Sequence, residues 1–160
     1  PMLEALAAVR EVCEATPGLN VIFPVHPNPN VRAQVRQVLA NVGQVHLIDP
    51  LDYVTFSHLM ARATLVVTDS GGIQEEAPSV SRPVVVLRET TERPEGIDAG
   101  VAVLVGTERG RVRDTLMRLL HDPAAYAAMT GKPNPYGDGQ ASDRIVKAML
   151  ERHVRRSGAQ

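Results

Sequence analysis

The chain has 160 residues, is 44% hydrophobic and 22% charged, and carries a formal net charge of −1. This length suits one domain with a single core, and the composition is that of a globular protein rather than a disordered chain. The near-neutral charge offers no basic surface to nucleic acid or an anionic membrane, and the lone Cys13 excludes an internal disulfide framework.

Taken in chain order, apolar residues first recur at helical spacing from Leu3 to Cys13, which predicts a helix that ends near residues 16–18. Short apolar runs typical of buried strands follow at residues 19–25, 45–48, 65–68, 84–87 and 101–105. Helical spacing predicts further helices over residues 31–42, 51–63, a short stretch after 72, 108–129 with a break near 122–123, and 142–155. Gly43 and Pro78 are expected to end two of these helices.

The predicted strands are apolar throughout instead of at every second residue, and helical patterns separate them. This arrangement favours a parallel sheet covered on both faces, which right-handed crossovers turn into an α/β, Rossmann-like three-layer domain. Ligands of such sheets bind beyond the carboxyl ends of the strands. Four loops with unusual residues follow strands here and are expected to share that edge: His26, residues 49–51, residues 70–72 and residues 88–96.

No apolar run reaches 18 residues, and no signal-peptide pattern is visible in the sequence. A single cysteine also fits a reducing compartment. We therefore expect a cytoplasmic protein that has neither a membrane nor a nucleic-acid partner.

Residues 65–96, LVVTDSGGIQEEAPSVSRPVVVLRETTERPEG, carry the most functional information. An apolar strand leads into Ser70-Gly71-Gly72 and then into a helix start, where close backbone approach and unpaired N–H groups suit a phosphate or diphosphate. Glu75 and Glu76 can accept hydrogen bonds from a ribose diol. The alternative is a plain Ser-Gly-Gly turn whose acidic neighbours only complement the helix dipole.

This segment closely resembles the non-hydrolysing UDP-N-acetylglucosamine 2-epimerase family, in residues 68–79 (TDSGGIQEEAPS) and 90–96 (TTERPEG). Three further segments match the family in the same order: residues 24–32 (PVHPNPNVR), 46–51 (HLIDPL) and 134–139 (NPYGDG).

The resemblance implies that residues 1–160 are the C-terminal UDP-sugar-binding domain, the second half of a two-domain glycosyltransferase-B-like fold. The N-terminal catalytic half would then be absent, which fits the way Pro1 opens directly in a helical pattern. Removal of a methionine before Pro1 in a complete protein is the alternative.

The reaction implied by the resemblance interconverts UDP-N-acetylglucosamine (UDP-GlcNAc) and UDP-N-acetylmannosamine (UDP-ManNAc). It eliminates UDP and adds it back, and it needs no NAD or metal cofactor. Because the family takes its acid and base groups from the other domain, we expect no catalytic residue here and no turnover by the isolated chain. The expected partners are UDP-GlcNAc or UDP, the chain's own N-terminal domain and a second copy in a homodimer.

The resemblance also assigns contacts with the phosphates and the ribose. Residues 70–72 match the family's phosphate-holding loop, and Glu76 matches its ribose-binding residue. Arg93 matches a ligand-binding arginine, and a guanidinium suits the oxygen atoms of phosphate groups. A salt bridge between Arg93 and the neighbouring Glu92 or Glu95 is the alternative.

Three further residues match positions around the nucleotide. Phe56 matches the aromatic residue that lies against uracil, although a phenylalanine at helical spacing also suits a core. Leu51 stands where the family contacts uracil, through its backbone amide and carbonyl. His26 matches a histidine that lines the cleft, so we assign it to ligand or effector contact instead of proton transfer. Residues 134–139 suit a structural turn as well as a ligand contact.

Two other functional classes stay open at this point. One is the nucleotide-binding half of a two-domain glycosyltransferase, which would transfer a sugar to an acceptor. Residues 90–95 (TTERPE) argue against it. The other is a non-catalytic domain that senses a UDP-sugar, which an upstream sequence without acid and base residues would favour.

Overall fold

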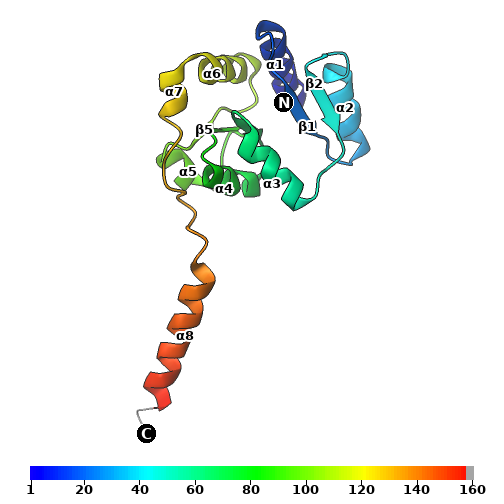
Figure 1. The fold of residues 1–160 in the computed structure, drawn as a ribbon. Coiled ribbons are helices and arrows are strands. Elements are labelled where there is room, and N and C mark those ends of the chain that lie inside the picture. Colours follow the sequence, from blue (N-terminus) through cyan, green and yellow to red (C-terminus); the bar gives the residue numbers. More distant parts are fainter. Residues whose placement is uncertain (158–160) are drawn as a thin grey trace.

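A computed structural model of the chain describes residues 1–157 and consists of an α/β body from which one helix projects (Figure 1). Strands and helices alternate along the body, as the apolar pattern predicts. In chain order the elements are α1 (Met2–Ala15), β1 (Val21–Pro24), α2 (Pro29–Leu39), β2 (Val45–Ile48), α3 (Tyr53–Arg62), β3 (Val66–Thr68), α4 (Gly71–Glu76), the 3₁₀ helix η1 (Ala77–Val80), β4 (Val84–Val86), α5 (Pro94–Asp98), β5 (Ala102–Leu104), α6 (Arg109–His121), α7 (Pro123–Ala127) and α8 (Ala141–Ser157).

Every strand pairing among the described residues is parallel. β1 pairs with β2, from Val21 opposite Val45 to Pro24 opposite Ile48, and β3, β4 and β5 lie side by side in that order. The ladder hydrogen bonds therefore join the strands as a pair and a triplet, whereas the sequence predicted one sheet. Each strand has only three or four residues and Pro24 has no N–H, so few backbone groups are available to connect the two sets.

The middle strand β4 is buried on both faces, which confirms the prediction of a sheet covered by two helical layers. Val85 packs in the larger core cluster, which contains side chains of α1, α2 and α6. Val84 and Val86 point the other way and pack with Met60 of α3 and Ala77 of η1. Side chains of all five strands take part in the larger cluster, so one core unites the pair and the triplet.

The carboxyl ends of β3 and β4 are held together at one edge, because the N–H of Leu87 donates to the carbonyl of Thr68 at 2.9 Å. The loop after β3 enters α4, which ends at Glu76 and tightens into η1 around Pro78, as the proline predicts. The loop after β4 enters α5, a helix that the sequence did not predict. Its signal was Pro94, since proline favours the first position of a helix.

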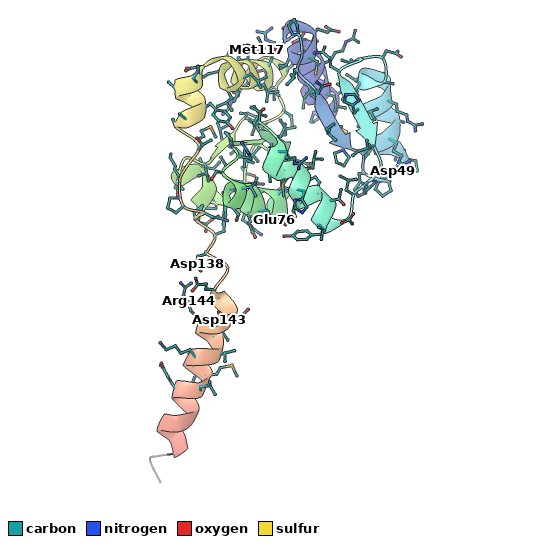
Figure 2. All side chains as sticks on the ribbon, in the orientation of Figure 1. Asp49, Glu76, Met117, Asp138, Asp143 and Arg144 are labelled. Atoms are coloured by element: carbon teal, nitrogen blue, oxygen red, sulfur yellow. The ribbon has the colours of Figure 1, made fainter. Side chains whose placement is uncertain are left out.

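The helix α8 extends away from the body, beyond the turn-rich segment 131–140 (Figures 1 and 2). Arg144 forms two hydrogen bonds with Asp138 at its start, at 2.8 and 2.6 Å. Four apolar side chains of α8 are 54–67% exposed: Ile145, Val146, Met149 and Leu150. Because 145 and 149, and 146 and 150, are four residues apart, they share one helix face that no described residue covers. Over residues 1–157, none of the helices is both long and apolar enough to cross a membrane.

Candidate functional site

The segment between β3 and α4 presents backbone N–H groups at the edge of the sheet. Ser70 is the N-cap residue of α4, with extended backbone angles, and its own N–H donates to Thr68 Oγ1 at 3.0 Å. Its hydroxyl makes no capping hydrogen bond. Since the first N–H groups of a helix lack intrahelical acceptors, those of Gly71 and Gly72 and the Ser70 hydroxyl can all turn to a ligand.

Both glycines are surrounded by the side chains that the sequence singled out. A Cβ added at Gly71 would lie 3.4 Å from Glu92 Oε1 and 3.9 Å from Arg93 Nη2. One added at Gly72 would lie 3.9 Å from Glu76 Oε1 and 4.0 Å from Ser70 Oγ. The structure therefore brings residues 70–72 and the loop of residues 88–96 together around one short stretch of accessible backbone.

Glu76 ends α4 with one carboxylate oxygen buried and unpaired. Its Oε2 is screened from solvent and accepts no hydrogen bond from any residue in the described part of the chain. A buried acceptor without a donor is unfavourable by about 1–3 kcal/mol, so the site favours a ligand that brings a donor. A hydroxyl group meets that need, which is consistent with the prediction that Glu76 binds a ribose.

Arg93 is held in place by Glu75, and not by the carboxylates of Glu92 or Glu95 that the sequence offered as partners. Its Nε donates to Glu75 Oε1 and its Nη1 to the backbone carbonyl of Glu92, the latter at 3.1 Å. The hydrogen bond that Arg93 donates to the Glu75 carboxylate raises the pKa of Arg93 above its usual value. The Glu92 carboxylate pairs instead with Arg88 at 2.7 Å, and its own backbone N–H, followed by Arg88, lowers the pKa of Glu92.

The loops after β1 and β2 form a second group. His26 is exposed, and its Nδ1 accepts a hydrogen bond from the Asn28 N–H at 3.2 Å. Arg32 of α2 pairs with Asp49 at 2.6 Å, which ties these two loops together. No hydrogen bond or ion pair found within residues 1–157 links this group to Ser70 or Arg93, and Figure 2 shows Asp49 and Glu76 in different parts of the molecule.

The two predicted uracil contacts lie at the start of α3. Phe56 is half-buried and packs against the smaller core cluster, which is the core role that its spacing also allowed. Leu51 is half-buried in the loop before the helix. Asp52 caps α3, accepting hydrogen bonds from the N–H and hydroxyl of Thr55 at 3.0 and 2.6 Å. The hydroxyl and then the N–H of Thr55 lower the pKa of Asp52.

Three residues hold the backbone of the site through hydrogen bonds that the sequence did not predict. Gln74 of α4 is buried, although both residues that follow it, Glu75 and Glu76, carry charge. Asn134 donates to the Glu75 carbonyl at 3.0 Å and to Ser79 Oγ at 2.6 Å. Tyr136 donates to the Arg93 carbonyl at 3.0 Å and accepts from the Gly96 N–H at 2.9 Å. The Asn-Pro-Tyr sequence was the available signal for the last two.

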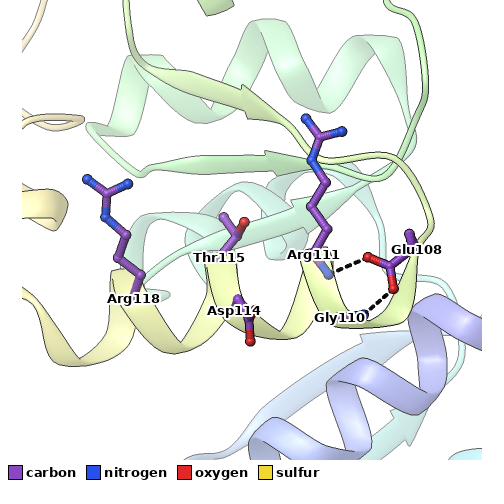
Figure 3. A pocket seen from close by; sticks show the side chains of 6 residues that line it. All are labelled: Glu108, Gly110, Arg111, Asp114, Thr115 and Arg118. Atoms are coloured by element: carbon purple, nitrogen blue, oxygen red, sulfur yellow. Dashed lines mark hydrogen bonds between the residues drawn. The ribbon is translucent and has the colours of Figure 1, made fainter.

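The depression drawn in Figure 3 lies along α6 and contains none of the predicted residues. The Glu108 carboxylate already accepts from the N–H groups of Gly110 and Arg111 there, at 2.8 and 2.7 Å. The bonds from Arg111 and then Gly110 lower the pKa of Glu108. These contacts cap the start of α6. Within residues 1–157, no cluster of three or more His, Cys, Asp and Glu could hold a metal ion.

Comparison with known proteins identifies relatives of this chain by sequence. A family model described as UDP-N-acetylglucosamine 2-epimerase matches residues 1–150. The UDP-N-acetylglucosamine 2-epimerase of Yersinia pestis is 49% identical over 148 residues, which are 92% of this chain and 39% of that protein. The enzyme of the same name from Escherichia coli K12 is 47% identical over 151 residues, 94% of this chain and 40% of that protein. The chain thus spans about 40% of the length of these relatives.

Solved structures match the fold at similar identity. The UDP-GlcNAc 2-epimerase of Neisseria meningitidis, solved bound to UDP-GlcNAc, is 41% identical with a TM-score of 0.88 and covers 94% of this chain and 41% of its own. A co-structure of Staphylococcus aureus MnaA with UDP gives 43% identity and a TM-score of 0.88, over 91% of this chain and 40% of its own. This chain therefore belongs to the UDP-N-acetylglucosamine 2-epimerase family, of whose members it spans one part.

Proposed function

We propose that this chain is the UDP-binding, C-terminal half of a UDP-GlcNAc 2-epimerase. The observation that carries the proposal is the unpaired Glu76 carboxylate beside the Ser70-Gly71-Gly72 helix start, in a chain of this family. Two similar proteins were solved with UDP or UDP-GlcNAc bound, which supports the ligand class.

The two sides of the helix start take different parts of the nucleotide in this proposal. The diphosphate lies against the N–H groups of residues 70–72, where the helix dipole and Arg93 stabilise its charge. Arg93 Nη2 is the guanidinium nitrogen nearest to Gly71, which suits it to a phosphate oxygen. Glu76 accepts from the ribose hydroxyls, so the unpaired oxygen gains its donor.

Uracil binding is assigned to the start of α3. Leu51 precedes α3 and supplies backbone groups, and Phe56 lies in the first turn of α3 and supplies an aromatic edge or face. The helix α3 packs beside α4 and η1. His26 contacts the sugar or an effector from the neighbouring loop. These assignments rest on the family resemblance, because no hydrogen bond or ion pair within residues 1–157 joins residues 26 and 51 to Glu76.

The proposed reaction eliminates UDP from the nucleotide sugar to leave a 2-acetamidoglucal, and then adds UDP back with the opposite configuration at C2. This half holds the leaving diphosphate, whose developing charge the residue 70–72 backbone and Arg93 stabilise. The groups that remove and return the C2 proton come from the N-terminal domain. The chain alone therefore binds the nucleotide without turning it over.

The N-terminal domain is also the proposed partner of α8. Four apolar side chains on one face of α8 are more than half exposed. Covering such a face with a partner is favourable by about 25 cal/mol for each Å² of apolar surface removed from water. We assign the contact to the face of Ile145, Val146, Met149 and Leu150. A homodimer of the complete protein is the proposed assembly.

A fusion tests the proposed activity. The residues of the E. coli K12 relative that precede its matched region are joined to this chain, and conversion of UDP-GlcNAc to UDP-ManNAc is followed by NMR. We expect turnover by the fusion, none by the chain alone, and a large loss in the fusion carrying Glu76→Ala. Turnover by the isolated chain, or full activity of the Glu76→Ala fusion, would contradict the proposal.

A further inference from the structure

Gln74 is the one polar side chain among the described residues that is fully buried, at 1% exposure. It lies in α4, four residues after Ser70 and directly before the two glutamates of the site. A buried amide is unfavourable unless its donor and acceptor are both bonded, whereas leucine of similar size has no such requirement. Packing alone therefore does not account for a glutamine at this position.

Both ends of the Gln74 amide bond to segments of the proposed nucleotide site. Its Nε2 donates to the Ser70 carbonyl at 3.2 Å, and its Oε1 accepts from the Thr91 hydroxyl at 2.7 Å. The Thr91 oxygen in turn accepts from the Arg93 N–H at 3.1 Å. A continuous series of hydrogen bonds thus runs from the start of α4 to the backbone of Arg93.

The series reaches Arg93 at a point that is fixed from the other side as well. The Arg93 carbonyl accepts from the Tyr136 hydroxyl at 3.0 Å, so its peptide groups are held at both ends. Glu75, the residue after Gln74, holds the guanidinium. The orientation of Arg93 toward Gly71 is therefore set by Glu75, by Tyr136 and by Gln74 acting through Thr91. Of these three residues, Gln74 is the one that also bonds the loop of residues 70–72.

We propose that Gln74 is a positioning residue that fixes the loop of residues 70–72 relative to residues 91–93, so that the two segments are spaced for one diphosphate. This inference deepens the proposed function and rests on it for the identity of the ligand. Gln74 touches no ligand in this scheme and acts through Ser70, Thr91 and Arg93.

Hydrogen exchange of the 160-residue chain tests the positioning without any ligand. Gln74→Leu keeps the side-chain volume and removes both hydrogen bonds, and Thr91→Val removes the middle of the series from a less buried position. We expect faster exchange at the Arg93 amide and at residues 70–74 in both variants, with α6 unchanged. Thr91→Ser keeps the hydroxyl and should restore the wild-type rates.

The matched control is Gln44→Leu. Like Gln74, Gln44 makes two side-chain hydrogen bonds, but it makes them in a different part of the molecule. Its Nε2 donates to the carbonyls of Thr16 and Leu19 at 2.9 and 3.1 Å. It should lose local protection near residues 16–19 and leave both site segments unchanged.

Ligand titration supplies the readout that a merely structural role would not give. Gln74→Leu and Thr91→Val should each weaken UDP binding about tenfold. The loss is expected because each variant removes hydrogen bonds that hold Arg93 in position for the diphosphate. Uridine, which lacks the diphosphate, should bind as it does to wild type. The double variant should be no weaker than either single one, because both interrupt the same series.

The outcomes separate the inference from the proposed function. Unchanged exchange in Gln74→Leu and Thr91→Val, equal losses for UDP and uridine, or additive losses in the double variant would overturn the role of Gln74. A wild-type chain that binds no UDP would overturn the ligand assignment alone, and the exchange rates would then decide the positioning role by themselves.

Discussion

Arg93 of the loop after β4 and Glu75 of α4 form an ion pair across the two segments of the site. Both side chains are partly exposed, at 34% and 40%, so the pair serves orientation more than stability. Glu75→Ala should weaken UDP binding about threefold to tenfold, because the guanidinium loses its anchor. Glu75→Gln keeps an acceptor oxygen, and its affinity for UDP should stay within about twofold of wild type. Calorimetric titration of each variant with UDP measures both affinities. Equal affinity of wild type and Glu75→Ala would show that Arg93 does not need Glu75.

The unpaired oxygen of Glu76 predicts a dependence on the ribose hydroxyls. Glu76→Gln should weaken UDP at least about tenfold, since hydrogen bonds to a charged acceptor are among the stronger ones. The same substitution should not change the affinity for 2′,3′-dideoxy-UDP, which has no hydroxyls to donate. Glu4→Gln, on the exposed start of α1, is the control and should bind both nucleotides as wild type does. A parallel loss for both nucleotides would exclude a ribose contact at Glu76.

The spacing of apolar residues was sufficient to predict the order of strands and helices. Burial of β4 on both faces follows from three consecutive valines, and the break between α6 and α7 follows from Asp122-Pro123. The division of the strands into a pair and a triplet was not predictable, because hydrogen bonds between short strands depend on tertiary packing.

The site could be predicted only in part. The approach of Gly71 to Arg93 followed from the topology, since loops after adjacent parallel strands meet at one edge. The partner of Arg93 did not, because Glu75 is eighteen positions away and Glu92 is adjacent. The role of Gln74 was not predictable for a similar reason: its amide oxygen accepts from Thr91, which is seventeen positions away.

Gly71 is predicted to be needed for binding and not for folding. A Cβ there meets its nearest atom, Glu92 Oε1, at 3.4 Å, an ordinary contact, so Gly71→Ala should fold with little change in stability. The added methyl group would stand where the diphosphate must approach the backbone, and UDP affinity should fall by about tenfold or more. Gly43→Ala, with nothing within 4 Å, is the control for both measurements. Undiminished binding by Gly71→Ala would contradict close approach at this loop.

Tyr136 is predicted to stabilise the fold through its hydroxyl. Tyr136→Phe removes the bond to the Arg93 carbonyl and leaves the buried Gly96 N–H without its acceptor. The free energy of unfolding measured in urea should fall by about 1–3 kcal/mol. Tyr53→Phe is the matched control, since that ring is 69% exposed and should change nothing measurable. A Tyr136→Phe chain as stable as wild type would show that the hydroxyl is dispensable.

Burial also raises the pKa of Tyr136 above the ordinary tyrosine value of 10.0. The folded state therefore favours the protonated phenol more than the unfolded state does, so this contribution to stability is complete below pH 10 and is lost as the pH rises through the folded pKa. Urea unfolding at rising alkaline pH should show a steeper loss for wild type than for Tyr136→Phe. Identical slopes for the two chains would contradict this contribution.

Calorimetric titration of this chain with UDP, with uridine as the comparison, tests the central claim most directly. The proposal predicts weak binding of UDP that disappears in Ser70→Asp. Aspartate is a good N-cap and should leave α4 folded, while its charge repels the diphosphate. No binding at millimolar UDP, or equal binding by Ser70→Asp, would contradict the claim that this half alone presents a formed site for the diphosphate and ribose.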